Sequence, residues 1–225
     1  MPAPHRLAAG IGLLLLGSVT GCYLFQPRNP QPPTQGGVPV DYSSTGASLT
    51  TMKLAIEAKG ASNSLTAYHD AFADSVVSGD RQSFLAFFDP TVVAVWQSAT
   101  SGTPPSIWTL KQEGQVLSYV IGLSGNDYVF SWLTDVDHPH DETPDPNTQV
   151  LHRQYVLEAQ APVQGGVKVD TLAIGYADLT FILGANAKWV ISRWQDRVDP
   201  AVGPNPPQGD KLSFTRMRLN TGAQP

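Results

Sequence analysis

Residues 167–183 read VKVDTLAIGYADLTFIL, and this stretch decides the fold that we expect. Its length and its content of β-branched and aromatic residues predict a single long strand. Strands of this length coil or carry bulges, because neighbouring strands in a sheet twist relative to each other. We place the bend at Gly175, near the middle of the stretch. The chain is therefore predicted to contain a strongly curved sheet.

Further strands are predicted on both sides of this stretch, separated by short links. The links include a Gln-Gly-Gly turn near 164–166 and a Gly-Ala-Asn-Ala segment at 184–187. Such tight links favour antiparallel pairing of the strands that they join. The expected strands span 91–97, 127–135, 149–160, 188–197 and, beyond a loop at 200–209, 212–219.

Helices are predicted mainly in the first part of the body, over 50–59, 62–78, 81–88 and about 104–123. In the second of these helices, apolar residues recur at spacings of three and four, which marks a buried face. Those residues are Leu65, Tyr68, Phe72 and Val76. Helices followed by a run of strands are typical of the α+β class. We therefore expect N-terminal helices packed on one face of a strongly curved, cone-like antiparallel sheet.

The composition limits the function classes. The chain has 225 residues, of which 41% are apolar and 15% are charged, and its formal net charge is −5. This acidic balance argues against a nucleic-acid partner, because such binding needs a basic patch. The single cysteine excludes an intrachain disulfide and a metal site built from several cysteines. The phosphate-loop, dinucleotide-binding and His-Glu-x-x-His motifs do not occur in the sequence, so we expect no cofactor.

The N-terminus has the layout of an export signal. Arg6 precedes an apolar run from Leu7 to Val19, which is too short to span the ~30 Å hydrocarbon core of a bilayer as a helix. The four residues that end at Cys22, Val-Thr-Gly-Cys, resemble the bacterial lipobox. The resemblance implies cleavage before Cys22 and attachment of lipid, with palmitate among the acyl chains. The alternatives are a free thiol behind an ordinary signal, or a buried core cysteine.

This assignment sets the expected domain organisation. A signal peptide at 1–21 precedes a lipidated cysteine and a Pro/Gly-rich tether at 22–48, a single α+β domain at 49–221 and a tail at 222–225. The prolines hold the tether extended. The lipobox resemblance implies an exported protein that is lipid-anchored to a bacterial membrane. In a host with two membranes we expect the outer one, because Tyr23 rather than an aspartate follows the cysteine.

Two segments carry a resemblance to a known family. AYHDAFADSVVSGDRQSFLAFFD at 67–89, followed by VVAVWQS at 92–98, resembles the opening of nuclear-transport-factor-2-like domains, which include SnoaL-like cyclases and ketosteroid isomerases. KWVISRWQDR at 188–197 is similar to the closing strand of that superfamily. The resemblance covers roughly residues 49–219 and implies a cone-shaped fold whose open end often holds an apolar pocket.

The same resemblance points to two candidate catalytic residues, because related enzymes use a strand carboxylate or a helix histidine as a general base. Asp178 lies in mid-strand between two apolar residues, so it is either an inward carboxylate with a raised pKa or a solvent-facing one. His69 lies in the second predicted helix, either as a base or as a surface or hydrogen-bonded core histidine.

A candidate ligand pocket is formed by tryptophans, whose indole N–H groups orient ligands in apolar cavities. It comprises Trp96, Trp132, Trp194 and Arg193, although core packing and ion pairing explain these residues equally well. Residues 135–145 hold five acids and two histidines, a combination that can bind a divalent cation. The spacing matches no calcium loop and suits an exposed hairpin connection, so we expect no metal site.

Together these features predict a membrane-anchored envelope lipoprotein whose α+β domain binds a small apolar ligand or an envelope protein. Whether the protein is an enzyme stays open. The alternative is a SnoaL-like lyase or isomerase with His69 or Asp178 as general base. A structural spacer with no binding site is a third possibility.

Overall fold

The computed structural model describes residues 36–58, 61–122, 127–206 and 211–222. The compact unit begins at Gly37, earlier than the expected boundary at residue 49. Val38 and Tyr42 are buried in the core, and the Tyr42 hydroxyl donates a hydrogen bond to the Ala67 carbonyl at 2.8 Å. The placement of residues 38–48 in the tether is therefore wrong, because they belong to the folded body.

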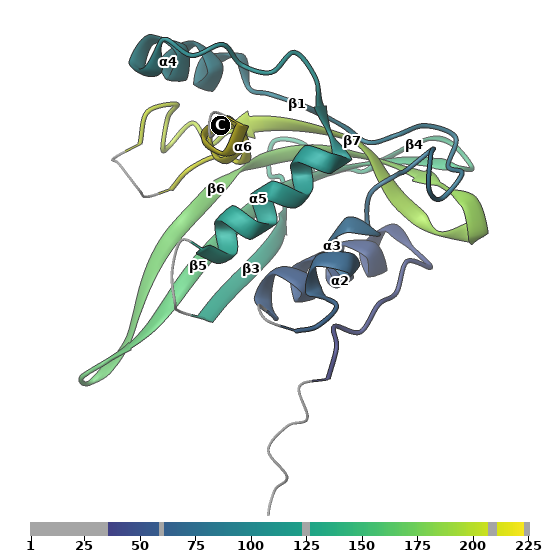
Figure 1. The fold of residues 1–225 in the computed structure, drawn as a ribbon, viewed down its shortest axis with the longest axis horizontal. Helices are drawn as coiled ribbons and strands as arrows, with labels where there is room; N and C mark the ends of the chain where they lie inside the picture. The colour runs from purple at the N-terminus through teal and green to yellow at the C-terminus, as the bar shows by residue number, and fades with distance from the viewer. Residues whose placement is uncertain (1–35, 59–60, 123–126, 207–210, 223–225) are drawn as a thin grey trace, which may run out of the picture. The chain divides into compact units, whose positions relative to one another are not determined.

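The expected curved sheet is present, and the described part of the chain contributes seven strands to it (Figure 1). The four long strands agree with the prediction, and β5 and β6 form a long hairpin. Their bounds are β3 Asp127–Thr134, β5 Thr148–Val163, β6 Gly166–Leu183 and β7 Trp189–Val198. Three short strands, β1 Leu85–Phe87, β2 Trp108–Thr109 and β4 Glu142–Asp145, complete the sheet. The strand order is β2-β1-β7-β6-β5-β3, with β4 paired to β5.

The pairing is antiparallel except between β1 and β7, which run parallel, so the sheet is mixed. The register shifts that bend the sheet lie at Leu157/Glu158 and at Thr180/Phe181, not at Gly175. Gly175 serves a different purpose, because a Cβ there would collide with the side chain of Tyr155. The glycine lets β6 pass close to a buried aromatic ring.

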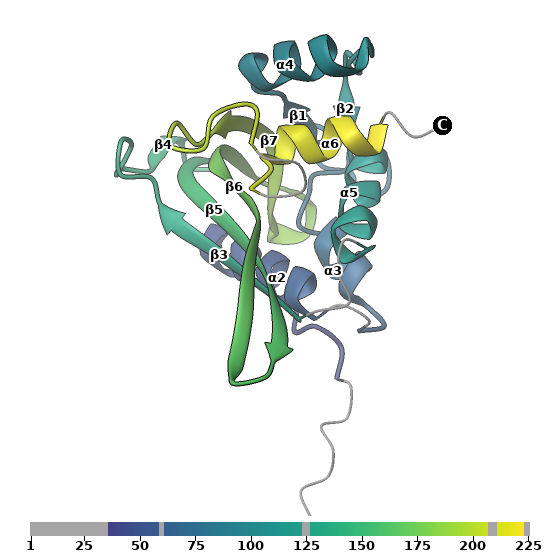
Figure 2. The same ribbon diagram turned by 90° about the vertical axis from the view of Figure 1, so that its left-hand side faces the viewer.

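Helices gather on one side of the sheet (Figure 2). The helices α2 Thr45–Glu57 and α6 Phe214–Gly222 contact the long strands directly. The helix α3 Ser64–His69 packs against α2 and α5, and α5 Leu110–Gly122 packs against α6 and the short strand β2. A further helix, α4 Pro90–Thr100, packs against α6. The layered α+β architecture that we expected is therefore present, although helices and short strands alternate along the first half of the chain.

The segment 91–97 was expected to be a strand and forms α4 instead. The Asp89 carboxylate accepts hydrogen bonds from the amides of Thr91 and Val92 at 2.8 and 3.2 Å, and Pro90 takes the first position of the helix. This cap outweighs the β-propensity of the valines. The segment 212–219, also expected as a strand, is largely α6, and only Leu212 bridges to Ala173 of β6.

Three predicted helices are wrong or too long, and the one expected from about residue 104 begins only at Leu110, after β2. Residues 81–88 contain the strand β1 rather than a helix, and the helix expected at 62–78 stops at His69. Tyr68 and Phe72 are buried as expected, but Leu65 lies on the exposed side of α3, and Val76 is exposed because it lies beyond the end of the helix.

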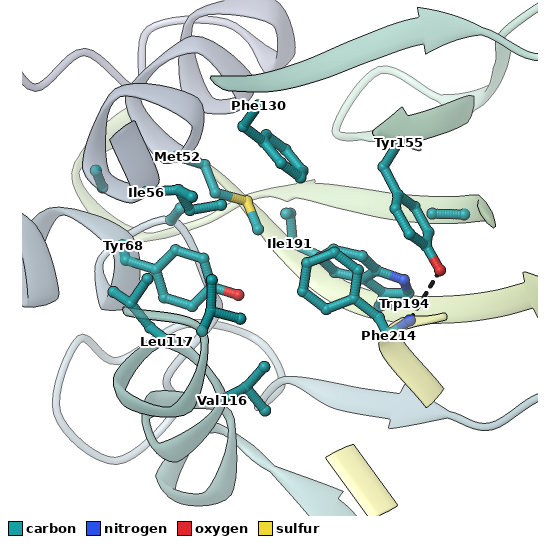
Figure 3. Close-up of a cluster of buried hydrophobic side chains, with 14 of the residues drawn as sticks. Met52, Ile56, Tyr68, Val116, Leu117, Phe130, Tyr155, Ile191, Trp194 and Phe214 are labelled. Carbon is teal, nitrogen blue, oxygen red and sulfur yellow. Dashed lines mark hydrogen bonds between the residues drawn. The ribbon is translucent and has the colours of Figure 1, made fainter. Parts of the chain in front are cut away.

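The main core lies between the sheet and the helices (Figure 3). Phe214 of α6 packs against Tyr155 of β5 and Trp194 of β7, with ring centroids 4.8 and 4.9 Å away. On the other side of this cluster, Met52 and Ile56 of α2 reach the same interior. The concave side of the sheet is therefore packed with side chains, and the C-terminal helix supplies part of the packing.

Candidate functional site

A groove between α3 and α5 lies beside the candidate residue His69. We call it the α3–α5 groove. It has a volume of about 730 Å³, which lies within the 300–1,000 Å³ range typical of small-molecule sites. Leu65 and Tyr119 give it apolar walls, and Thr66, Gln115 and Ser118 provide uncharged polar groups. Asp70 and Lys111 add one charge of each sign.

His69 lines this groove and is half-buried. Its imidazole has no hydrogen-bond partner among the described residues, so both ring nitrogens are available to a ligand. Gly114 of α5 faces it, and a Cβ at that glycine would stand 4.0 Å from His69 Cδ2. Because the glycine has no side chain, the groove stays open beside the imidazole at this point.

Asp178 lies elsewhere, on the opposite face of the sheet. Its neighbours Ala177 and Leu179 point into the core, and alternate residues of a strand face opposite sides. Of the two orientations left open for Asp178, the structure therefore has the outward-facing one. The structure does not bring it together with His69, so the two do not form a single catalytic pair.

On that outer face, Asp178 belongs to a charged cluster. Its Oδ1 lies 2.7 Å from His152 Nδ1, on the paired residue of β5, and accepts a hydrogen bond from Arg197 Nη2 at 3.0 Å. Arg197 also donates to Asp135 at 2.6 Å. Burial raises the pKa of Asp135, but the hydrogen bond from Arg197 and those from Asp137 and His138 outweigh it and lower the pKa to about 2.

The acidic segment 135–145 thus finds partners within the protein. Besides Asp135, the carboxylate of Asp141 forms a bidentate pair with Arg153, at 2.6 and 2.7 Å. Within residues 36–58, 61–122, 127–206 and 211–222, no group of three His, Cys, Asp or Glu residues is arranged to hold a metal ion. The charges of this segment are used to fix the β3–β5 connection.

The interior contains a buried ion pair that the sequence did not suggest. Arg218 of α6 donates from Nε and Nη2 to the two carboxylate oxygens of Glu113 of α5, both at 2.8 Å. Trp108 Nε1 and the Tyr68 hydroxyl donate to the same carboxylate at 2.7 and 3.1 Å. Burial lowers the pKa of Arg218, but the charge and hydrogen bonds of Glu113 raise it above its ordinary value.

A second buried carboxylate lies on β7. Asp196 accepts hydrogen bonds from the Tyr155 hydroxyl at 2.8 Å and from the Thr215 amide at 2.6 Å. Burial raises its pKa, and the nearby Arg218 charge opposes the rise. Tyr155 in turn accepts from the Phe214 amide at 2.9 Å (Figure 3). Both buried carboxylates therefore serve to fasten α6 to the body.

The candidate pocket of tryptophans is not assembled as expected. Trp132 and Trp194 do meet, with ring centroids 5.7 Å apart, but both take part in the packed interior. Trp96 lies in a separate cluster with Val92 and Leu219, and Arg193 points to the other face of the sheet. The prediction of one pocket lined by these four residues is wrong.

Glu113 and Arg218 are the residues that sequence reasoning missed. Glu113 precedes Val116 and Leu117 by three and four positions, so it shares their buried helical face. Arg218 follows Phe214 by four positions in the same way, but the strand assignment of 212–219 hid that spacing. A charged residue at a buried helical position was the available signal.

The lipobox, Cys22 and the signal peptide lie outside the described residues. Among the residues that are described, no helix is long and apolar enough to cross a membrane.

No family model and no curated protein match the chain. Solved structures that resemble it include a protein of unknown function from Mycobacterium tuberculosis, with 13% sequence identity, a TM-score of 0.47 and coverage of 80% of this chain and 91% of that chain. A putative dehydratase of the nuclear-transport-factor-2-like family from Streptomyces avermitilis has 11% identity, a TM-score of 0.44 and coverage of 69% and 93%. A ketosteroid isomerase-like protein from Erwinia carotovora atroseptica has 11% identity, a TM-score of 0.41 and coverage of 71% and 97%.

Proposed function

We propose that this chain is an exported protein, anchored through lipid on Cys22, whose α+β body binds a small ligand in the α3–α5 groove. The export signal and the lipobox resemblance support the anchor. The observation that carries the binding role is the groove itself, because its volume suits a small molecule and polar side chains, including His69 and Lys111, line it beside apolar walls. Side chains fill the interior where the pocket of tryptophans was predicted, whereas the α3–α5 groove beside His69 is accessible.

The groove favours a ligand with an apolar body and one acidic group. Leu65 and Tyr119 give apolar contact, and Lys111 offers a cation that has no ion-pair partner among the described residues. Asp70, in the same groove, disfavours a ligand with several negative charges. We therefore select 2-naphthoate, a flat aromatic monocarboxylate, as the probe.

The test uses substitutions at Gly114. A phenylalanine there projects into the groove beside His69 and fills it, whereas an alanine adds only a methyl group at ordinary contact distance. We expect 2-naphthoate to shift the amide resonances of residues 114–118 in the wild-type chain and in Gly114→Ala, and to leave them unchanged in Gly114→Phe. Equal responses from all three chains would show that the groove is not the binding site.

A second candidate function rests on His69. Because its imidazole is free and lines the groove, it can act as a general base toward a bound carbon acid. It would take a proton from the carbon next to a carbonyl and return a deuteron in heavy water. We expect the chain to accelerate deuterium exchange into 2-tetralone and His69→Gln to lose the acceleration. If exchange proceeds at the solvent rate with the wild-type chain, the enzymatic reading fails while the binding reading stands.

A further inference from the structure

A small apolar pocket lies at the edge of the sheet, apart from the α3–α5 groove. It is lined by residues 85–88, which include β1, and by residues 105–108, which lead into β2, and its volume is about 140 Å³. Three large apolar side chains around it are exposed: Leu85 at 39%, Phe87 at 38% and Ile107 at 60%. We call this the β1–β2 pocket. Exposed apolar side chains that gather around a hollow mark an interaction site more often than singly scattered ones do.

The surroundings of the pocket are unusual in charge. Residues 90–110 contain no acidic, basic or histidine side chain, in a chain with 33 Asp, Glu, Lys and Arg residues (14 + 19). A cation near the pocket is Arg193 of β7, which pairs directly with Leu85 in the parallel ladder and therefore faces the same side of the sheet. Its guanidinium lies 4.2 Å from the centre of the Phe87 ring. Arg193 forms no ion pair with any of the described residues.

The size of the pocket selects the kind of occupant. Small-molecule sites usually measure about 300–1,000 Å³, and this pocket is well below that range. It has room for one large apolar side chain. Because Arg193 stands unpaired at its rim, an acidic group next to that side chain would gain a charge-assisted hydrogen bond. We propose that the β1–β2 pocket docks a protein partner that inserts one large apolar side chain and pairs a neighbouring carboxylate with Arg193.

Two other occupants fit less well. A second copy related by a two-fold axis through the pocket would bring the two Arg193 side chains toward each other, and like charges repel. A bilayer contact uses apolar side chains that protrude, whereas this site includes a concavity that receives one. A partner that presents one large apolar side chain with a carboxylate beside it fits both the hollow and the charge of Arg193. The proposal stands independently of the ligand proposed for the α3–α5 groove.

The experiment is a selection of seven-residue random peptides, displayed on phage, against the full chain. We expect the enriched peptides to share a large apolar residue with Asp or Glu beside it. Binding of a synthetic version should fall at least tenfold with Ser106→Phe, which fills the pocket from an exposed lining position, and with Arg193→Glu. Ser98→Phe, on the exposed surface of α4 outside the pocket, is the matched control and should bind as the wild-type chain does.

Several results would overturn the proposal. Peptides that lack an acidic residue, or that bind all variants equally, contradict the assigned pocket. Self-association that Ser106→Phe abolishes would assign the pocket to a second copy instead. Sedimentation with phosphatidylglycerol vesicles that the same variant abolishes would assign it to a bilayer.

Discussion

The buried pair of Glu113 and Arg218 allows a sharp prediction, because each side chain has zero exposure and each neutralises the other. Replacing Arg218 by methionine removes the guanidinium but leaves the carboxylate buried with only the Trp108 and Tyr68 donors. Replacing Glu113 by glutamine leaves the guanidinium without an anion. Breaking a buried ion pair in this way costs about 3–5 kcal/mol of unfolding free energy.

The double variant behaves differently. With Glu113→Gln and Arg218→Met together, neither member of the pair is left as an unpaired charge, and the glutamine carbonyl still accepts one hydrogen bond from Trp108 or Tyr68. Asp196 loses the nearby Arg218 charge but keeps its hydrogen bonds from Tyr155 and Thr215. Exchange of a buried ion pair for uncharged side chains of similar size is often close to neutral. We therefore expect the double variant to be more stable than either single variant, so that its loss of unfolding free energy is far below the sum of the two single losses.

Urea unfolding, followed by tryptophan fluorescence, measures these free energies. For a body of this size each kcal/mol corresponds to about 2–4 °C in Tm, so each single variant should melt about 6–20 °C lower. Should a single variant fail to fold, Arg218→Lys keeps the charge without the bidentate geometry and gives a smaller loss. The reasoning is refuted if the two single losses simply add in the double variant, or if each is below about 1 kcal/mol.

Four further predictions concern other parts of the chain. Cys22→Ser should leave an uncleaved precursor without lipid, which mass spectrometry of membrane fractions detects; normal maturation of this variant would contradict the lipobox. Deletion of 23–36 should leave Tm unchanged, whereas deletion of 23–47 removes a buried valine and tyrosine and should cost about 3–6 kcal/mol in calorimetry. The pKa of Asp135 lies below its unfolded value of 3.8, so the ionised carboxylate contributes about 2 kcal/mol of unfolding free energy above pH 4, which is lost as the pH falls toward 2. In Asp135→Asn the unfolding free energy should therefore change less between pH 4 and pH 2. Gly114→Ala should raise the unfolding free energy by about 0.5–1 kcal/mol, since the helix gains a better former without a clash, and an unchanged or lower Tm would argue against that placement.

The sequence predicted the long strands well because their signals are local. The strands β5, β6 and β7 are rich in β-branched and aromatic residues and are joined by short links, so their positions follow from the chain itself. The segment 91–97 was mistaken because its valines favour a strand, while the deciding interaction is the hydrogen bonding of the Asp89 carboxylate to two amides. The helix cap formed by Asp89 outweighs the β-propensity of the valines, and the geometry of that cap cannot be seen in the sequence alone.

The candidate site was less predictable because it depends on pairings between distant segments. Whether Asp178 points inward depends on a bulge between Thr180 and Phe181 and on the register with β7. A shift by one residue turns every side chain of a strand to the opposite face. In the same way, the meeting of Glu113 with Arg218 joins residues 105 positions apart. Charge and helical spacing could have marked Glu113 as unusual, but only the assembled fold shows that it pairs with Arg218.

The placement of α6 has a consequence for how the protein is made. Phe214 and Arg218 belong to the last described helix, yet they complete the interior around Tyr155 and Glu113. The native state therefore cannot form until α6 has been synthesised, and Glu113 has no cation beside it before then.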